Sequence, residues 1–327
     1  MSLRSQDPRM IVQALLRRLP LAFVTLLVLS LVVFFGGQLL PGDVGRAVLG
    51  PLADARAVAL FNHAIGVDRA IPVQYWEWIS RFVRGDMGES YTFRAPVAPF
   101  VLAALTNSLK LAAMAFCMIL PLGILGGVVA ALNVGGWKDR VIILTGQSLG
   151  VVPEFISAIV LILIFGIWLR WLPMSADWPD GANALTQARY LVLPSLPLVI
   201  IYFGYVARVA RTGAVAALDS DYTRTAILKG LPPRTILFRH VLRNALLPTI
   251  TVAASLVGYL TGGLVVVETL FHYRGIGSLI YTAAKAKDFP MLMAGVLVVG
   301  MLYTVAAIVG DVLAEMLDPK LGARGRA

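Results

Sequence analysis

The sequence is poor in the residues that carry most enzyme and metal chemistry. It has one cysteine and three histidines among 327 residues. The lone Cys117 excludes an internal disulfide and a cysteine metal cluster, and its place inside an apolar run predicts a packing role rather than a reactive thiol. His63, His240 and His272 fall in three separate segments, a pattern that indicates neither a metal site nor a nucleophilic centre.

Two motifs are also missing. No Gly-x-x-x-x-Gly-Lys-Ser/Thr loop occurs, so the chain has no evident means of holding the phosphates of ATP. We therefore expect no enzyme activity and no cofactor in this chain by itself. Basic patches interleaved with aromatics, typical of nucleic-acid binding, are not apparent, and we expect no nucleic-acid partner. The net charge of +10 is instead typical of a membrane protein that retains Lys and Arg on its cytoplasmic side.

Charge itself is scarce, since charged residues make up 14% of the chain and hydrophobic residues 58%. A helix of about 20 apolar residues crosses the roughly 30 Å of bilayer hydrocarbon. Six apolar runs have this character, and we expect an all-α membrane protein with about six transmembrane helices in a lipid bilayer. The runs cover residues 19–40, 108–131, 141–169, 190–207, 246–267 and 291–313.

The first apolar run follows Arg17 and Arg18, as the apolar part of a signal peptide would. It is longer than such a region, and Pro41-Gly42-Asp43 follows it where a cleavage site would stand. We expect a retained membrane helix at 19–40.

The basic residues predict the orientation. With the N-terminus inside, the cytoplasmic segments hold sixteen Lys and Arg, against eleven in the longer outside segments. The cytoplasmic segments are 1–18, 132–140, 208–245 and 314–327. We therefore expect a multi-pass protein of a bacterial plasma (inner) membrane with both termini in the cytoplasm. Residues 41–107 would form a periplasmic excursion and residues 108–313 a five-helix transmembrane core.

The excursion 41–107 is dense in Trp, Tyr and Phe and carries six basic and six acidic residues. Its length predicts a small folded periplasmic cap. Within it, Pro72 to Ile79 has the pattern of an amphipathic helix lying along the interface, where Trp and Tyr are favoured. The helix would anchor the cap to the membrane surface or, alternatively, take part in ligand binding.

The inside segment 208–245 carries seven basic and two acidic residues and predicts two short helices. The first begins at the N-cap pair Ser220-Asp221 and ends before Gly230, which suits a left-handed C-cap. Pro232-Pro233 prevents its continuation. The second helix runs over 234–245, and its apolar side is expected to hold Leu237, Phe238, Val241, Leu242 and Ala245.

This segment resembles the cytoplasmic coupling loop of ABC importer permeases, and more narrowly that of the dipeptide, oligopeptide and nickel family. Residues 221–231 match D-Y-x-R-T-A-x-x-K-G-L, and residues 239–248 match R-H-x-x-x-N-A-x-x-P. Ile227-Leu228 depart from the small and basic residues common at those places. Further stretches resemble motifs of the family's first, B-type permease in the same order. They are Leu39-Leu40-Pro41-Gly42-Asp43, Val267 to Phe271, Gly275 to Leu279, Asp288-Phe289-Pro290 and Asp318-Pro319-Lys320.

The resemblance implies a type I importer permease fold with a small periplasmic insertion after the first helix. The chain would form half of a pathway for di- or oligopeptides, and nickel complexes or glutathione are alternative cargoes. Its implied partners are a second, homologous permease in a heterodimer, one or two cytoplasmic ATPase subunits that bind ATP and Mg, and an extracytoplasmic binding protein. The residues that the resemblance assigns to ATPase coupling are Asp221, Tyr222, Arg224, Thr225, Ala226, Gly230, Leu231, Arg239 and His240.

An ion-coupled secondary transporter is the alternative from a different class. It would more typically show an inverted repeat and several buried acids. The apolar runs show no convincing repeat and one conspicuous acid, Glu154, beside Pro153. A buried ionisable group in a membrane is costly and by default functional. Glu154 would line the translocation path and meet an ammonium group or a cation, pair with a neighbouring subunit, or face a water-filled crevice. Three Gly-x-x-x-Gly pairs, starting at Gly123, Gly146 and Gly258, predict close helix packing.

Overall fold

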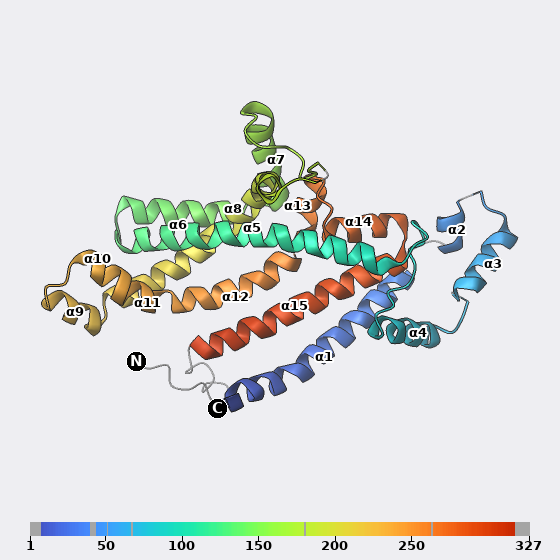
Figure 1. The fold of residues 1–327 in the computed structure, drawn as a ribbon, viewed down its shortest axis with the longest axis horizontal. Coiled ribbons are helices and arrows are strands. Elements are labelled where there is room, and N and C mark those ends of the chain that lie inside the picture. The colour runs from blue at the N-terminus through green and yellow to red at the C-terminus, as the bar shows by residue number, and fades with distance from the viewer. Residues whose placement is uncertain are drawn as a thin grey trace. The chain divides into compact units, whose positions relative to one another are not determined.

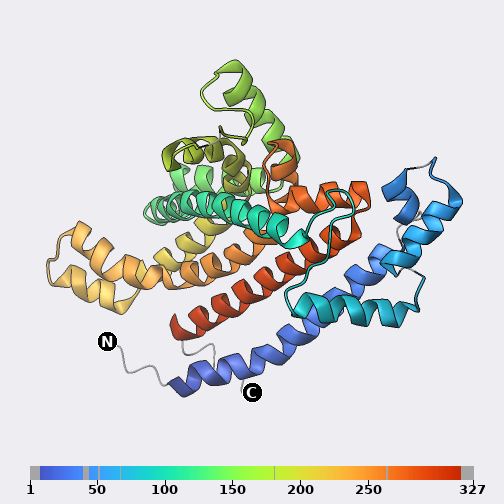
Figure 2. The ribbon, with the colours of Figure 1, turned by 45° about the vertical axis from the view of Figure 1, so that its right-hand side comes forward.

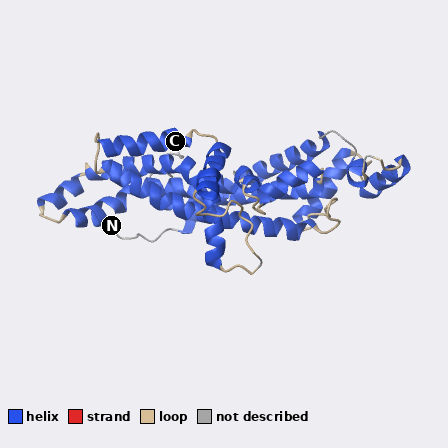
Figure 3. Ribbon diagram, turned by 90° about the horizontal axis from the view of Figure 1, so that it is seen from above, coloured by secondary structure: helices blue, strands red, loops and turns tan. Residues whose placement is uncertain are grey.

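The computed structural model describes residues 8–39, 44–50, 52–66, 68–179, 181–262 and 264–317. Helices joined by loops make up this part of the chain, and it contains no β-strand (Figure 3). The all-α fold class is confirmed. The helices of the first half are α1 (Pro8–Leu39), α2 (Val44–Leu49), α3 (Ala55–Ile65), α4 (Ile71–Val83), α5 (Val97–Ala131), α6 (Trp137–Gly150), α7 (Glu154–Leu161) and the π-helix η1 (Ile162–Trp168). The second half has α8 (Ala184–Leu218), α9 (Asp221–Leu228), α10 (Pro233–Thr235), the π-helix η2 (Ile236–Val241), α11 (Leu242–Ala245), α12 (Leu247–Gly262), α13 (Val265–Leu270), α14 (Ile276–Ala286) and α15 (Phe289–Leu317).

Among the described residues, four helices are long and apolar enough to cross a bilayer: α1, α5, α8 and α15. Two bent pairs raise the number to six when each pair counts as one span. The first pair joins α6 to the helix that ends at Trp168, with a bend of 107°, and the second joins the Pro233–Ala245 helix to α12, with a bend of 49°. The expectation of about six spans is confirmed.

Several helices differ from the predicted spans. The third run, 141–169, is not one straight helix, because Val151 to Pro153 interrupt it. Pro153 has no N–H to donate to the preceding turn, and its ring disfavours the helical conformation at the residue before it. The fourth helix extends well beyond its predicted end and reaches Leu218, so the first part of the segment 208–245 is helical.

The described residues divide by their contacts into two compact units. The larger unit comprises residues 8–16, 109–273 and 303–317. Its long helix α8 packs against α6, α7, α11 and α12. Small residues allow these approaches: a Cβ atom at Gly204 of α8 would lie 2.2 Å from the Gly146 carbonyl oxygen of α6, too close for any side chain. In Figures 1 and 2, α9, α10 and α11 lie together at the end of α8. The close packing predicted at Gly146 is present.

The smaller unit comprises residues 17–108 and 274–302. The start of α5 packs there against α14 and α15 through a buried cluster that includes Val97, Ile276 and Met291. The segment predicted as an interfacial helix lies within α4. One side of α4 packs on α1, since the Trp78 and Phe34 rings stack with centroids 5.7 Å apart. No residue of α4 is fully buried, and Val73 and Trp76 are exposed.

Two of the sequence motifs fall largely or wholly outside the described residues. Residues 40–43 of the first motif are not described, and neither is the motif 318–320 near the end of the chain. The predicted cytoplasmic termini are described only for residues 8–18 and 314–317.

Candidate functional site: a two-helix loop joined to α8

The last turn of α8 is fastened to α9 by side-chain hydroxyls. Thr223, which is buried, donates a hydrogen bond to the Ala217 carbonyl oxygen at 2.7 Å, and Ser220 donates to the same oxygen at 2.6 Å. Ser220 occupies the N-cap position of α9, as predicted, but its hydroxyl does not cap that helix. The predicted start of the helix is therefore confirmed, while the Ser220 hydroxyl satisfies a carbonyl at the end of α8 instead of an N–H of α9.

The C-terminus of α9 is closed by a Schellman motif. The Gly230 N–H donates to the Ile227 carbonyl at 2.9 Å, and the Leu231 N–H donates to the Ala226 carbonyl at 3.3 Å. Gly230 has φ of +70°, a left-handed conformation that costs an L-residue roughly 1–2 kcal/mol. Leu231 and Ala226 belong to one apolar cluster, which is the contact that accompanies this motif. The left-handed conformation predicted for Gly230 is present.

The second helix of the segment contains a π-helical stretch, η2. Its buried side chains are Ile236, Val241 and Ala245, and these pack with Ala217 and Ala226 of the same cluster. A π-turn closes an i to i+5 bond, so Ile236 and Val241, five residues apart, lie on one face. The sequence prediction had assumed an ordinary helical period and placed Phe238 on the buried side. That placement was wrong, since Phe238 is 69% exposed.

The structure separates the predicted coupling residues into three groups. Ala226 is buried and holds α9 to the cluster. Leu231 and His240 are half-buried. The exposed ones are Asp221, Tyr222, Arg224, Thr225, Gly230 and Arg239.

The sequence prediction missed two exposed apolar side chains on the same helix. Leu228 is 88% exposed and Ile227 58% exposed, beside Tyr222 at 41%. Their departure from the family pattern was the only signal that could have singled them out. Leu and Ile side chains exposed to water on a short helix are candidates for burial against a partner, although these residues point in different directions around α9. We call Tyr222, Ile227 and Leu228 the α9 patch.

An ion pair braces α8 one turn before the cluster. The Arg211 guanidinium on α8 donates to the Asp139 carboxylate on α6 through Nε at 2.5 Å and through Nη2 at 2.7 Å. The Asp139 side chain is only 8% exposed and the Arg211 side chain 28%. The same carboxylate accepts the Gly135 N–H at 2.9 Å, so the loop before α6 is included in this brace. Bidentate geometry of this kind fixes direction as well as distance.

Glu154 lies at the break between α6 and α7, as the first residue of α7. Its Oε1 atom is buried and has no hydrogen-bond partner among the described residues. The carboxylate is close enough to the Tyr202 hydroxyl on α8 to interact with it electrostatically, and Tyr202 has the same relation to Tyr259 on α12. The three polar side chains thus come from three helices of the larger unit.

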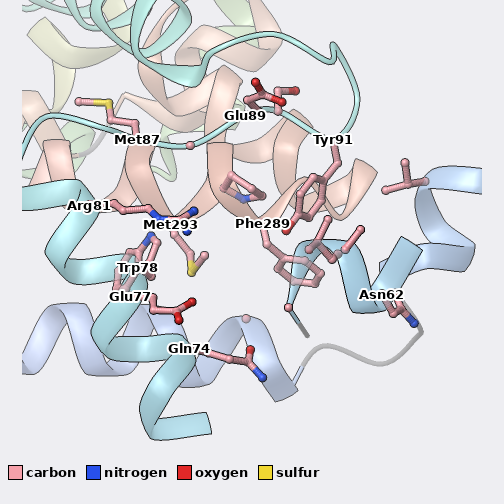
Figure 4. Close-up of a pocket in the computed structure, with 18 of the residues that line it drawn as sticks. Asn62, Gln74, Glu77, Trp78, Arg81, Met87, Glu89, Tyr91, Phe289 and Met293 are labelled. Carbon is pink, nitrogen blue, oxygen red and sulfur yellow. The ribbon is translucent and has the colours of Figure 1, made fainter. Parts of the chain in front are cut away.

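The smaller unit contains a cavity of about 1050 Å³ beside α4. Figure 4 shows Glu77, Trp78 and Arg81 of α4 and Met293 of α15 at its wall. The lining carries guanidinium and carboxylate groups in equal number, from Arg69, Arg81, Arg94, Glu77, Asp86 and Glu89. One pair is already joined, since Arg69 Nη1 lies 2.6 Å from Glu77 Oε1. The cavity is suited to a polar ligand that carries both charges.

Asp288 connects the loop before α5 to the start of α15. It is 1% exposed, accepts the Ser90 hydroxyl, and accepts the Tyr91 and Thr92 N–H groups at 3.2 Å each. Burial, and secondarily the negative charge of Asp288, raise the pKa of Tyr91 to about 12. The motif Asp288-Phe289-Pro290 thus has a structural reason, because its carboxylate holds together two segments of the smaller unit.

Comparison with known proteins was made for the whole chain. Residues 123–323 match the family model described as the binding-protein-dependent transport system inner membrane component, and residues 11–114 match the model of its N-terminal part. A peptide ABC transporter permease protein of Sinorhizobium fredii is 31% identical over 94% of this chain and 98% of its own length. A peptide transport system permease protein of Brucella melitensis is 32% identical, over 95% and 99%.

Two further likenesses were found. The glutathione transport system permease protein GsiC of Salmonella typhi is 33% identical over 94% of this chain and 97% of its own length. A crystal structure of an amino acid ABC transporter with histidines is 14% identical, with a TM-score of 0.42 over 70% of this chain and 94% of that one.

Proposed function

Since the chain belongs to the family of binding-protein-dependent transport system inner membrane components, we propose that it forms half of a peptide pathway and receives force through the segment 208–245. It is a multi-pass inner membrane protein and a permease subunit of an ABC importer of the peptide family. The family favours this class over an ion-coupled secondary transporter. The proposal concerns which surface takes up the force, what cargo crosses and which partners complete the complex.

The observation that carries the proposal is the α9 patch. Ile227 and Leu228 are exposed on a helix of eight residues, where they do not stabilise the isolated chain. Burying each of these side chains against a partner would contribute about 1.5–3 kcal/mol to the free energy of binding. Among the exposed charged residues of 219–239, the basic Arg224, Lys229, Arg234 and Arg239 outnumber the acidic Asp219 and Asp221. The patch suits a groove that is apolar at its floor and acidic at its rim, on a cytoplasmic ATPase subunit.

Force applied at this patch has a direct route into the membrane helices. The hydroxyl bonds to the Ala217 carbonyl and the Schellman motif hold α9 rigidly at the end of α8. The buried cluster beneath α9 includes Ala214 and Ala217 of α8, so a shift of α9 displaces α8 as well. Asp221, Arg224 and Thr225 would position the partner, while Gly230 and Leu231 would keep α9 fixed in its orientation at the end of α8.

The cargo that the relatives support is a peptide. Two of them are named for peptide transport, and the third is named for glutathione, itself a tripeptide. We propose di- or oligopeptides as the cargo of this chain, with glutathione as the second candidate that a specific relative favours. Selection among peptides would fall largely to an external binding protein.

The remaining partners follow from the same proposal. A second, homologous permease would complete the pathway as a heterodimer, and one or two ATPase subunits would bind ATP and Mg in the cytoplasm. Both termini and the segment 208–245 would face the cytoplasm, with the excursion 41–107 on the periplasmic side. The charged cavity beside α4 would then face the binding protein. The chain itself would catalyse no reaction.

A pair of matched substitutions tests the coupling surface. Leu228→Asp places a charge on the α9 patch, and Leu185→Asp places one at a side chain of similar exposure, 81%, in the first turn of α8. Neither change removes an internal contact of consequence. In the purified complex we expect Leu228→Asp to lower ATPase co-purification and ATP-driven peptide uptake at least tenfold, with Leu185→Asp close to wild type. Intact co-purification and uptake in Leu228→Asp would refute the assignment of this surface.

A further inference from the structure

The break between α6 and α7 places irregular backbone and an acidic side chain in the middle of a bent helix pair that is a candidate membrane span. The helices on either side meet at 107°, and Val151 to Pro153 form the turn between them. Non-helical backbone at membrane depth is tolerated only where protein buries it or where it lines a water-filled space. The side chains around the turn are themselves exposed in this chain, with Val151 at 82% and Phe155 at 49%. The turn therefore faces something other than its own subunit.

Glu154 is the acidic side chain at this turn, and the chain does not neutralise it. Its Oε1 atom is buried without a hydrogen-bond partner, and it forms no ion pair with any described residue. Two basic groups of the larger unit are engaged elsewhere: Arg211 holds Asp139, and Lys110 lies over the Trp178 ring at 5.6 Å. A carboxylate in such a place is costly unless a positive group reaches it.

Helix α8 packs against α7, which begins at Glu154, and against α12. Tyr202 of α8 lies within electrostatic range of Glu154, and Tyr259 of α12 lies within that range of Tyr202. Along α8, Tyr205 follows Tyr202 by three residues and is 50% exposed, and along α12, Ser255 precedes Tyr259 by four, so each pair shares a helix face. Tyr259 is 55% exposed. Tyr205, Ser255 and Tyr259 are thus exposed hydroxyl residues on apolar helices, and they are suited to a hydrated path better than to lipid.

We propose that Glu154, Tyr202 and Tyr259 form a binding station for a primary ammonium group, the N-terminal amine of the peptide cargo. The inference deepens the proposed function and rests on it. An ammonium group offers three N–H donors, which match one carboxylate and two phenol oxygens. The bond to the carboxylate is charge-assisted, and aromatic faces add cation–π attraction. The exposed edge at Tyr259 lets the amine enter and leave, as transport requires.

Uptake measured in proteoliposomes with the complete complex tests the station. The probes are trialanine and N-acetyl-trialanine, each supplied with saturating binding protein. We expect Glu154→Gln to lower the maximal uptake rate of trialanine about tenfold or more and to leave that of N-acetyl-trialanine unchanged. Glu154→Asp should retain more than a third of the trialanine rate. Tyr259→Phe should lower the trialanine rate severalfold, whereas Tyr303→Phe, a half-exposed tyrosine on α15, should not.

Each other outcome has a definite meaning. An unchanged trialanine rate in Glu154→Gln overturns the station. Equal loss for both peptides, or loss of the second permease from the purified complex, also overturns it and identifies Glu154 as a subunit contact. If wild-type complex takes up neither peptide on addition of ATP, the proposed peptide function fails instead, independently of the substitution at Glu154.

Discussion

The Asp139–Arg211 pair provides a quantitative test of how α8 is held. Both side chains belong to the larger unit, and two hydrogen bonds of 2.5 and 2.7 Å join them. Removing one partner from a buried pair costs about 3–5 kcal/mol, whereas an exposed pair contributes about 0–1 kcal/mol. The exposed fractions, 8% for Asp139 and 28% for Arg211, place this pair between the two limits, closer to the first.

The unequal burial predicts unequal single substitutions. Arg211→Ala leaves the Asp139 carboxylate buried with only the Gly135 N–H, and we expect it to lower the free energy of unfolding by about 3 kcal/mol. Asp139→Ala leaves a guanidinium that can turn its head toward water, and we expect a loss of about 2 kcal/mol. The double substitution should cost about 3 kcal/mol, so the coupling energy is about 2 kcal/mol.

The measurement is a double-mutant cycle on unfolding in mixed micelles, titrated with SDS and followed by far-ultraviolet circular dichroism. The Arg69–Glu77 pair is the matched control, since its 2.6 Å contact is as short but its side chains are 51% and 39% exposed. Its cycle should give a coupling energy below about 1 kcal/mol. Additivity within about 0.5 kcal/mol at Asp139 and Arg211 would refute the brace, and a larger loss for Asp139→Ala than for Arg211→Ala would refute the burial argument.

Three further predictions concern single glycine and proline residues of the helices and turns, two of them with a matched control. Gly204→Ala should lower the free energy of unfolding of the larger unit by several kcal/mol, because its Cβ would lie 2.2 Å from a backbone oxygen. Gly36→Ala is the control, since nothing lies within 4 Å of its Cβ, and in the same unfolding assay it should leave stability unchanged or raise it. Gly230→Ala and Gly135→Ala both place Ala at φ near +70° in open space and should each cost about 1 kcal/mol, but only Gly230→Ala should reduce peptide-stimulated ATP hydrolysis. Pro197→Ala restores a backbone N–H donor inside α8 and so removes a point at which the helix can bend. We expect it to slow peptide uptake severalfold while ATP hydrolysis continues. An equal loss of both rates would contradict a role of Pro197 in bending α8.

Hydropathy predicted the helices but not their ends. A run of apolar residues marks where lipid surrounds a helix, and nothing in that signal stops the helix outside the lipid. The helix α8 continues through Arg208 and Arg211 to Leu218 because the intervening residues are mostly Ala and Val, which do not break it. The bend at Pro153 could have been anticipated from proline chemistry, but its angle depends on packing against α8 and α13.

The sequence motif over 221–248 predicted which segment forms the candidate site, but not which of its side chains are buried and which are exposed. Gly230 was assigned its conformation because only a left-handed residue closes the helix in that way. The burial of Thr223 and the exposure of Phe238 were not foreseen, since the first depends on the end of another helix and the second on a π-turn. Local sequence patterns carry neither piece of information.

Contacts between distant residues were beyond sequence reasoning altogether. Asp139 lies 72 residues from Arg211, and Asp288 lies 198 residues from Ser90. In the sequence, Asp139 and Asp288 are each one charged residue among several. Neither a helical repeat nor an adjacent residue indicates which partner each would contact. Glu154 was different, because an ionisable residue inside an apolar run is conspicuous by itself.

The arrangement of α8 explains how a small shift at α9 could move the C-terminal part of α8 while the Glu154 station stays in place. The helix is fastened toward its C-terminal end by Arg211 and by the hydroxyl bonds to Ala217, while Pro194 and Pro197 interrupt its hydrogen bonds in its N-terminal half. Twenty residues separate Pro197 from Ala217, about 30 Å of helix. Because α8 is held firmly at one end and is weakened at Pro194 and Pro197, we expect it to rotate about these prolines. Tyr202 lies close to that point, so a rotation of α8 would change the distance from Tyr202 to α7 little. The same rotation would move the end of α8 at Leu218 most. The station would then keep its geometry as the path opens beneath it, which is the condition for holding a cargo amine until the exit is clear.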